Sequence, residues 1–447
     1  MYNKEIIKLI FPISEKKVND LLLTALAYAL KDALGGTTHG ISLEGHGREP
    51  IDDTINVGNT LGWFTTIFPV KLNLKDAIGD SIKSIKEQLR AIPDKGLGFS
   101  ALSCYNKKSN QTFSMQSLPP IVFNYLGQFD SKETATDNAH WSFATELSGE
   151  SVNAKNQSDD LISINGGVHD GCLQFAIHSR LDQSTAKALS AAMQYHLQQI
   201  IKHCLAQTKK GIKAFTPSDF PETILKSHWL DAFQKQAYKK QRIIQAIYPA
   251  NSLQRGFIYH ALAQADDDAY CVQSVIDYHC KVDLQYYQDA WQYVLDTYPG
   301  LRAAFNWEHE IQQIIYRDVP LKLDFMDIRN TKDIAKAIIK HQKLERAKPF
   351  DLSRPPLLRL LLLQCGDSHY TLIKTEHHSI SDGWSGPVMM ACVHRYYQQL
   401  VDKKPIQLQQ DPSYLEAQRY YVKQKESITE YWDQQGDHLA QCNDLNP

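Results

Sequence analysis

The stretch Glu376-His377-His378-Ser379-Ile380-Ser381-Asp382-Gly383 decides how the second half of this 447-residue chain is interpreted. It closes an apolar run at residues 370–377 that is typical of a β-strand, and a helical pattern at residues 388–400 follows. Adjacent side chains of a strand point to opposite faces, so His377 and His378 are not expected to bind one metal ion. No third ligand stands at a metal-like spacing, so the pattern predicts no metal site. We expect one histidine to face a functional site and the other to pack inside the protein.

This histidine pair has two interpretations. Two adjacent histidines taken alone are more often a buried structural pair, whereas Asp382 and Gly383 at this spacing favour a catalytic site. An imidazole accepts or shares a proton near neutral pH, which suits acid/base catalysis. Asp382 follows across a turn and is expected to brace the loop. Gly383 and Gly386 allow the backbone to turn sharply.

The first half of the chain carries a separate group of motifs. Glu44-Gly45-His46-Gly47-Arg48-Glu49 follows a predicted strand, and Phe123-Asn124-Tyr125-Leu126-Gly127-Gln128 overlaps another one. Two glycines beside a carboxylate and a histidine indicate a close approach of the backbone to a substrate. Taken alone, the same residues are more often a glycine-rich turn with solvated charges. The pattern by itself therefore leaves the role of Glu44 open.

Strand and helix patterns alternate in both halves, which predicts an α/β or α+β fold with mixed sheets. The pattern loosens after a predicted helix at residues 183–206, where turn-forming residues such as Pro217 and Pro221 break the periodicity. We therefore predict one domain at residues 1–206 and a second at residues 244–447. The linker between them, residues 207–243, is expected to carry one short helix.

The composition excludes several classes of function. The net charge is −2 and no basic stripe stands out, so neither nucleic acid nor another polyanion is expected as a partner. The eight cysteines contain no Cys-x-x-Cys pair and are expected to be reduced. Apolar runs such as Leu360 to Leu363 are far shorter than a membrane span, and the polar start of the chain is not typical of a signal peptide. These features predict a cytoplasmic protein without a membrane segment.

The second half resembles the N-terminal lobe of a nonribosomal peptide synthetase condensation domain. Four segments carry the resemblance: residues 248–256, 298–305, 350–359 and 377–385. The second of them departs from the family pattern, because Thr297, Tyr298 and Pro299 stand where the family usually has Arg, His and Glu.

The resemblance implies roles for particular residues of this half. His378 would be the catalytic histidine that orients, or deprotonates, an amine as it attacks a thioester, and His377 would pack behind it. Asp382 would form a buried ion pair with Arg302 that shapes the site. Because breaking such a pair strands a charge, the resemblance predicts that Asp382→Ala impairs folding more than His378→Ala does.

The first half resembles the C-terminal lobe of an epimerisation domain. Five motifs occur in the family's order, at residues 19–26, 44–49, 62–69, 93–99 and 123–130. By this resemblance, Glu44 transfers the Cα proton of a thioester-bound amino acid or peptide, and Asn124 and Tyr125 help to line the site. No His-His-x-x-x-Asp-Gly stretch precedes Glu44 in the sequence, so the opposing histidine is expected on another lobe.

Together, the resemblances imply a piece of a nonribosomal peptide synthetase that spans an epimerisation-to-condensation junction. Each half is expected to form a chloramphenicol-acetyltransferase-like sandwich lobe, and the two lobes are joined by a linker. No cofactor is expected to bind directly, because the substrates would arrive on the 4'-phosphopantetheine arms of peptidyl carrier proteins. The missing synthetase lobes would be further partners. The amino acids that are handled are not encoded in a readable motif.

Several alternatives stay open at this point. The chain works as an enzyme with lobes of another polypeptide, or it is a non-catalytic remnant or docking fragment of a split synthetase. A hybrid cleft, in which the two lobes pair and His378 faces Glu44, is a less favoured arrangement. A stand-alone chloramphenicol-type acyltransferase is disfavoured by the epimerase-type motifs.

Overall fold

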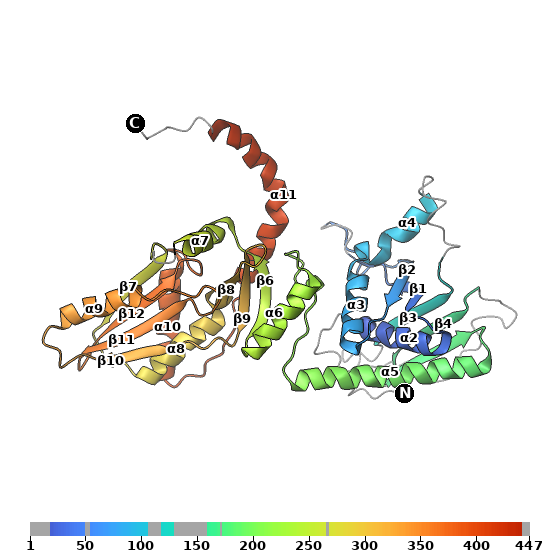
Figure 1. The fold of residues 1–447 in the computed structure, drawn as a ribbon, viewed down its shortest axis with the longest axis horizontal. Helices are drawn as coiled ribbons and strands as arrows, with labels where there is room; N and C mark the ends of the chain where they lie inside the picture. The colour runs from blue at the N-terminus through green and yellow to red at the C-terminus, as the bar shows by residue number, and fades with distance from the viewer. Residues whose placement is uncertain are drawn as a thin grey trace. The chain divides into compact units, whose positions relative to one another are not determined.

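The computed structural model describes residues 18–49, 54–105, 118–128, 159–169, 172–264 and 268–439. The chain divides into two compact units, Met1–Ala214 and Phe215–Pro447, which are described separately below (Figure 1). Residues 129 and 130, at the end of the last epimerase-type motif, lie outside the described part.

The first unit contains one five-stranded sheet with the strand order β2-β1-β3-β4-β5. Its strands are β1 (Thr38–Gly45), β2 (Thr66–Asn73), β3 (Ile121–Gln128), β4 (Ile162–His169) and β5 (Cys172–Ser179). The pairs β1–β2 and β4–β5 are antiparallel, whereas β1–β3 and β3–β4 are parallel. The sheet is therefore mixed, as the alternating pattern predicted.

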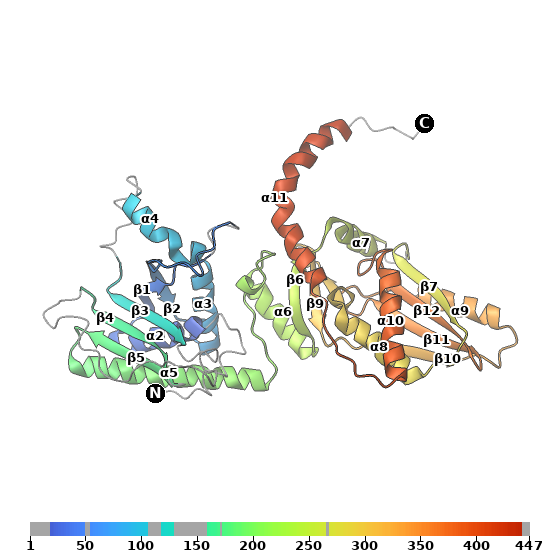
Figure 2. The same ribbon diagram turned by 180° about the vertical axis from the view of Figure 1, so that it is seen from behind.

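Helices cover one face of this sheet (Figure 2). They are α2 (Val18–Leu34), α3 (Ile78–Arg90), α4 (Leu97–Tyr105) and α5 (Gln183–Lys209), with a 3-10 turn η2 (Pro93–Gly96). Apolar side chains of α2, α3 and α5 share one core with Ile41, Leu43 and Phe123 of the sheet. Because side chains alternate along a strand, Glu44 and Asn124 lie on the other face, where they are only half-buried.

The second unit contains a four-stranded sheet, β10-β11-β12-β7, and a three-stranded sheet, β6-β9-β8. The strands are β6 (Ile243–Pro249), β7 (Cys271–Tyr278), β8 (Ala303–Asn306), β9 (Gln312–Arg317), β10 (Leu323–Asp327), β11 (Leu358–Gly366) and β12 (His369–His377). Among these described strands, β10 and β11 run parallel and the other neighbours are antiparallel. The α/β class predicted from the sequence is confirmed in both units.

Helices pack on both faces of the four-stranded sheet. The helices of this unit are α6 (Ser227–Lys239), α7 (Ser252–Ala263), α8 (Leu284–Thr297), α9 (Ile334–Arg346), α10 (Ser385–Val401) and α11 (Ser413–Leu439), with 3-10 turns η4 (Pro217–Asp219) and η5 (Pro299–Arg302). Leu360 and Leu362 face the large core with α8 and α10, whereas Leu361 and Leu363 face a smaller cluster under α9. A strand buried on both faces needs a continuous apolar run, which explains the four consecutive leucines.

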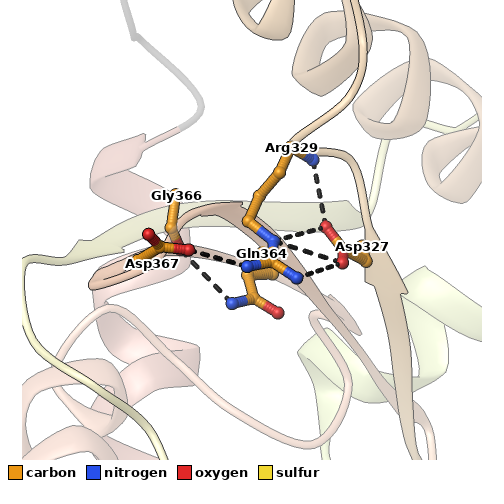
Figure 3. Close-up of polar contacts among 5 residues, drawn as sticks. All are labelled: Asp327, Arg329, Gln364, Gly366 and Asp367. Carbon is orange, nitrogen blue, oxygen red and sulfur yellow. Dashed lines mark hydrogen bonds and ion pairs between the residues drawn. The ribbon is translucent and has the colours of Figure 1, made fainter.

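Arg329 connects the end of strand β10 to the turn between β11 and β12 (Figure 3). Arg329 donates to Asp327 at the end of β10 and to Asp367 in the turn between β11 and β12, at 2.8 and 2.7 Å. All three side chains are exposed, so these ion pairs orient the turn and add little stability.

The linker predicted at residues 207–243 needs correction. Helix α5 continues to Lys209, and the second unit already begins at Phe215. Trp229 and Leu230 of α6 are buried in the core of that unit, and Trp229 Nε1 donates to Glu308 Oε2 at 2.8 Å. Turn-forming residues break the local periodicity here. The helix that follows them nevertheless packs into the core of the second unit, which is formed by residues far away in the sequence.

Candidate functional site

The end of strand β12 separates the two adjacent histidines. The backbone N–H of His377 donates to Leu357 O at 3.0 Å, and that of His378 donates to Tyr270 O at 2.9 Å. The His377 side chain is buried and the His378 side chain is half-buried. The structure thus assigns the interior to His377 and the more open position to His378, in keeping with the alternation of a strand.

His377 is held as a neutral structural group. Its Nδ1 shares a 2.8 Å hydrogen bond with Ser379 Oγ, and its ring meets Phe350 edge-on. Burial, and to a smaller extent the neighbouring His378, lowers the pKa of His377 to about 4. His377 is therefore uncharged at neutral pH.

His378 has one of its two ring nitrogens committed. Nδ1 lies 2.7 Å from Ser381 O, and a carbonyl oxygen only accepts hydrogen bonds, so Nδ1 carries the hydrogen. In a neutral imidazole this leaves Nε2 with a lone pair that can accept a proton. The ring also stacks on Phe257 of α7, with centroids 5.5 Å apart and planes 10° apart. The geometry suits a general base or a hydrogen-bond acceptor.

Arg302 and Asp382 do not form the ion pair that the resemblance implied. The Arg302 guanidinium is buried and donates to four oxygens elsewhere: Leu295 O, Asp296 O at 2.7 Å, Tyr316 O at 2.9 Å and Gln245 Oε1 at 2.9 Å. Two of these are carbonyl oxygens in the last turn of α8, which have no partner within the helix and favour a cation. Arg302 is a helix-end brace.

Asp382 instead sits at the start of helix α10. It is exposed and accepts hydrogen bonds from Ser385 N at 2.9 Å and from Ser385 Oγ at 2.7 Å. These hydrogen bonds lower the pKa of Asp382. The expected brace of the loop is therefore local, because Asp382 closes the turn that leads into α10. Gly383 does not adopt a positive φ, and a Cβ there would meet no atom within 4 Å, so the turn does not depend on a glycine.

A buried ion pair precedes the histidines on the same strand. Lys374 and Glu376 are 3% and 4% exposed, and Lys374 Nζ pairs with Glu376 Oε1. The second carboxylate oxygen, Glu376 Oε2, is buried without a hydrogen-bond partner. Neither residue was singled out from the sequence, although two charges at positions i and i+2 of an apolar strand are an unusual pattern.

In the first unit, the strand register brings Glu44 and Asn124 together. Leu43 of β1 pairs with Phe123 of β3, so the next residues are neighbours, and Asn124 Nδ2 donates to Glu44 Oε2 at 2.7 Å. Burial raises the pKa of Glu44, the charge of Asp160 raises it further, and the hydrogen bond from Asn124 opposes both. A carboxyl with a raised pKa is better suited to carrying a proton near neutral pH.

Tyr125 does not join this pair. It follows Asn124 on β3 and therefore points to the opposite face. There its ring packs against the core, with its centroid 6.4 Å from that of Phe175 on β5. Burial raises the pKa of its phenol. The prediction that Tyr125 lines the site beside Glu44 is not supported by this geometry.

The glycine-rich loop after Glu44 is explained by its own packing. Gly47 has φ +63°, and a Cβ there would lie 1.6 Å from Phe64 O. Arg48 Nη1 donates to Val57 O at 2.6 Å and to Thr60 O at 2.8 Å, and its guanidinium lies 4.5 Å from the centre of the Phe64 ring. The close approach predicted for a substrate is thus made by the chain's own backbone at Phe64.

The described residues show neither of two other classes of feature. They contain no group of three or more His, Cys, Asp or Glu residues arranged to hold a metal ion. Among the same residues, no helix is long and apolar enough to cross a membrane.

Comparison with known proteins identifies the family. The condensation-domain family model matches residues 9–216 and again residues 244–447. This chain belongs to the condensation-domain family. The recognition made from the motifs is confirmed, and each unit carries its own match to the condensation domain.

Two relatives of this condensation-domain chain are named as synthases. A linear gramicidin synthase from Brevibacillus parabrevis is 34% identical over 406 residues, which cover 88% of this chain and 5% of the relative. Bacitracin synthase 3 of Bacillus licheniformis is 30% identical over 428 residues, which cover 93% of this chain and 6% of the relative. The condensation-domain chain thus spans a small fraction of the length of these relatives.

Solved structures of the family are also similar to parts of the chain. The epimerization domain from the third module of tyrocidine synthetase B matches 45% of this chain and 46% of its own, with 35% sequence identity and a TM-score of 0.41. The starter condensation domain of rhizomide synthetase matches 43% of this chain and 50% of its own, with 17% identity and a TM-score of 0.40.

Proposed function

We propose that the second unit supplies the catalytic histidine of a peptide-bond-forming condensation site. The amine nitrogen of an acceptor attacks the carbonyl carbon of a donor thioester, a C–N bond forms, and the C–S bond breaks. His378 Nε2 accepts the proton that the amine loses, and the thiolate that leaves takes up a proton. The observation that supports this role is the hydrogen bond from Nδ1 to Ser381 O, because it keeps the Nε2 lone pair free.

We propose a second chemical role for the first unit. Epimerisation removes the Cα proton of a thioester-bound residue on one face and returns a proton on the other, so it needs two acid/base groups. Glu44 would be one of them, and its raised pKa supports this role. Asn124 would orient the carboxyl through their 2.7 Å hydrogen bond. We assign the opposing group to a further lobe of the synthetase.

The substrates and partners follow from these roles. We propose that both units act on aminoacyl or peptidyl thioesters carried by 4'-phosphopantetheine on peptidyl carrier proteins, and that complementary lobes complete each cleft. The similarity to synthetases that are many times longer supports an origin in such an assembly. A non-catalytic docking fragment stays the main alternative.

The condensation role is tested by reconstitution. The chain is combined with a separately expressed complementary lobe and two loaded carrier proteins, and the dipeptidyl thioester is detected by mass spectrometry. We expect His378→Ala to lower the rate by about 10²- to 10⁴-fold, the usual contribution of a positioned acid/base group. His228→Ala, at an exposed histidine of α6, is the matched control and should keep the wild-type rate. Equal rates for the two variants would refute the assignment.

The epimerisation role is tested by isotope exchange. A carrier-bound aminoacyl thioester is incubated with the chain in D₂O, and deuterium at Cα is measured. We expect no uptake with this chain alone, and uptake once a lobe that bears the opposing group is added. Glu44→Gln should abolish the restored exchange. Appreciable uptake without the added lobe would contradict the assignment of the second group to another lobe.

A further inference from the structure

Helix α7 begins with a reciprocal cap that holds Gln254 in place. Asn251 Oδ1 accepts from Gln254 N at 2.8 Å, and Gln254 Oε1 accepts from Asn251 N at 3.1 Å. The cap uses the amide oxygen of Gln254 and leaves its NH₂ group available as a donor. The side chain is only 5% exposed, so its direction is determined by its surroundings.

The NH₂ group of Gln254 reaches the histidine loop. Gln254 Nε2 donates to Ser379 O at 3.0 Å, a buried contact between residues 125 positions apart. Ser379 directly follows His378, so this bond fixes the backbone on the C-terminal side of the catalytic candidate. On the N-terminal side of the loop, strand β12 already holds the chain.

One turn further along α7, Phe257 contacts the imidazole itself. Residues three apart on a helix lie on the same side, so Gln254 and Phe257 both face the loop. The Phe257 ring lies nearly parallel to that of His378. It also packs against the Tyr270 ring, with the two ring centroids 4.5 Å apart. The carbonyl of Tyr270 accepts the backbone N–H of His378 at 2.9 Å. Phe257 therefore bridges the His378 ring and the residue just before β7 that anchors the His378 backbone.

These contacts restrict different degrees of freedom of the same side chain. The stack on Phe257 sets the plane of the ring, the bond to Ser381 O sets which nitrogen carries hydrogen, and Gln254 holds the loop that contains that carbonyl. With the plane and the Nδ1 direction both set, the direction of the Nε2 lone pair is determined as well. An imidazole free to rotate would point Nε2 at the reacting amine only part of the time.

We propose that Gln254 and Phe257 are positioning residues that hold His378 in the orientation and tautomer required of the catalytic base. The inference rests on the proposed function of His378. Neither residue is assigned a contact with substrate, and both act through the histidine.

The test reads the tautomer of His378 by NMR in the full chain labelled with ¹⁵N and ¹³C histidine. Correlations between ring nitrogens and carbon-bound hydrogens distinguish Nδ1–H from Nε2–H, and His378→Gln identifies the relevant signals. We expect the Nδ1–H form to dominate in the wild type. In Phe257→Leu its ratio to the Nε2–H form should fall roughly 2- to 12-fold, the range that the loss of one aromatic pair implies.

The other variants separate positioning from general packing. Gln254→Glu keeps the oxygen that caps α7 but loses the donor to Ser379, and it should shift the ratio in the same direction. Phe257→Tyr keeps the ring and should restore the wild-type ratio. Tyr259→Leu, at a 73% exposed side chain of the same helix, is the control and should leave the ratio unchanged. Phe257→Met replaces Phe257→Leu if the latter does not fold.

An unchanged tautomer ratio in folded Phe257→Leu and Gln254→Glu overturns the proposal, as does a wild-type His378 that is mainly Nε2–H. The measurement needs no catalytic turnover, so it is independent of the condensation assay. If the ratio shifts as expected but His378→Ala retains full activity in reconstitution, the proposed function fails while the positioning contacts stand.

Discussion

Glu44 lies near the end of strand β1 and His378 directly follows strand β12, but their surroundings act on different properties. Around Glu44, burial and the charge of Asp160 raise the pKa, and a hydrogen bond from Asn124 orients the carboxyl. Around His378, a carbonyl, an aromatic ring and a braced loop set the tautomer and the plane of the ring. A proton-transfer group can thus be prepared through its proton affinity or through the direction of a lone pair.

The largest expected effect lies on the strand that carries His378. Glu376→Ala leaves the Lys374 ammonium buried without its acidic partner, so it should lower the free energy of unfolding of the second unit by about 3–5 kcal/mol. The measurement is urea unfolding followed by methyl NMR of Met389, which is buried in this unit. Met193, buried in the first unit, reports that unit separately and should not respond.

The matched control replaces both charges. Lys374→Met combined with Glu376→Leu keeps the volume and removes the stranded charge, so the double variant should recover most of the loss. A double variant as unstable as Glu376→Ala would show that the Glu376 carboxylate stabilises β12 through a contact other than its ion pair with Lys374.

The next effect concerns the buried neighbour of the catalytic candidate. The pKa of His377 falls from 6.5 to about 4 on folding, so the folded state favours the neutral ring. The stability that this provides is complete above pH 6.5 and is lost as the pH falls towards 4, with a total of roughly 3 kcal/mol. The wild type should therefore lose stability over this range relative to His377→Gln, measured through Met389. If the two proteins lost stability equally over this pH range, His377 would not be a buried neutral group.

A smaller effect is expected at the helix that follows the loop. Asp382→Ala removes the exposed acceptor of two hydrogen bonds from Ser385 and should cost about 1 kcal/mol, far less than the loss of a buried ion pair. The family resemblance predicted a larger cost, that of breaking a buried ion pair with Arg302. Ser385→Ala, which removes one of the two donors to Asp382, should cost no more than Asp382→Ala. If Asp382→Ala lowered the free energy of unfolding by several kcal/mol, the result would favour the ion pair between Asp382 and Arg302.

The smallest effect concerns the pH dependence of stability that Glu44 gives to the first unit. Because its pKa is raised above 4.5 on folding, the folded state favours the protonated carboxyl. The stability of the first unit should therefore decrease as the pH rises through 4.5 towards the folded-state pKa. Glu44→Gln cannot ionise, so it should gain stability relative to the wild type as the pH approaches neutrality, measured through Met193. A relative loss over this range would mean that Glu44 is stabilised as a carboxylate.

Much of the fold was predictable because it depends on local periodicity. The helix that became α5, the strand that ends at Glu44 and the strand that ends at His377 each follow from the spacing of apolar residues. The same alternation predicted that one histidine is buried and the other faces outwards. A short helix was expected within residues 207–243, but its packing was not predictable in this way, because the burial of α6 depends on a core formed elsewhere in the chain.

The order of motifs along the sequence determined the condensation-domain family and the choice of Glu44 and His378, because these features depend on which residues stand next to one another. The tertiary structure decided their partners. Arg302 binds carbonyls of α8, Gly47 makes room for Phe64, and Gln254 and Phe257 of α7 reach the histidine loop. Such contacts join segments that are far apart in the chain, and only the packing of the folded units determines which donor meets which acceptor.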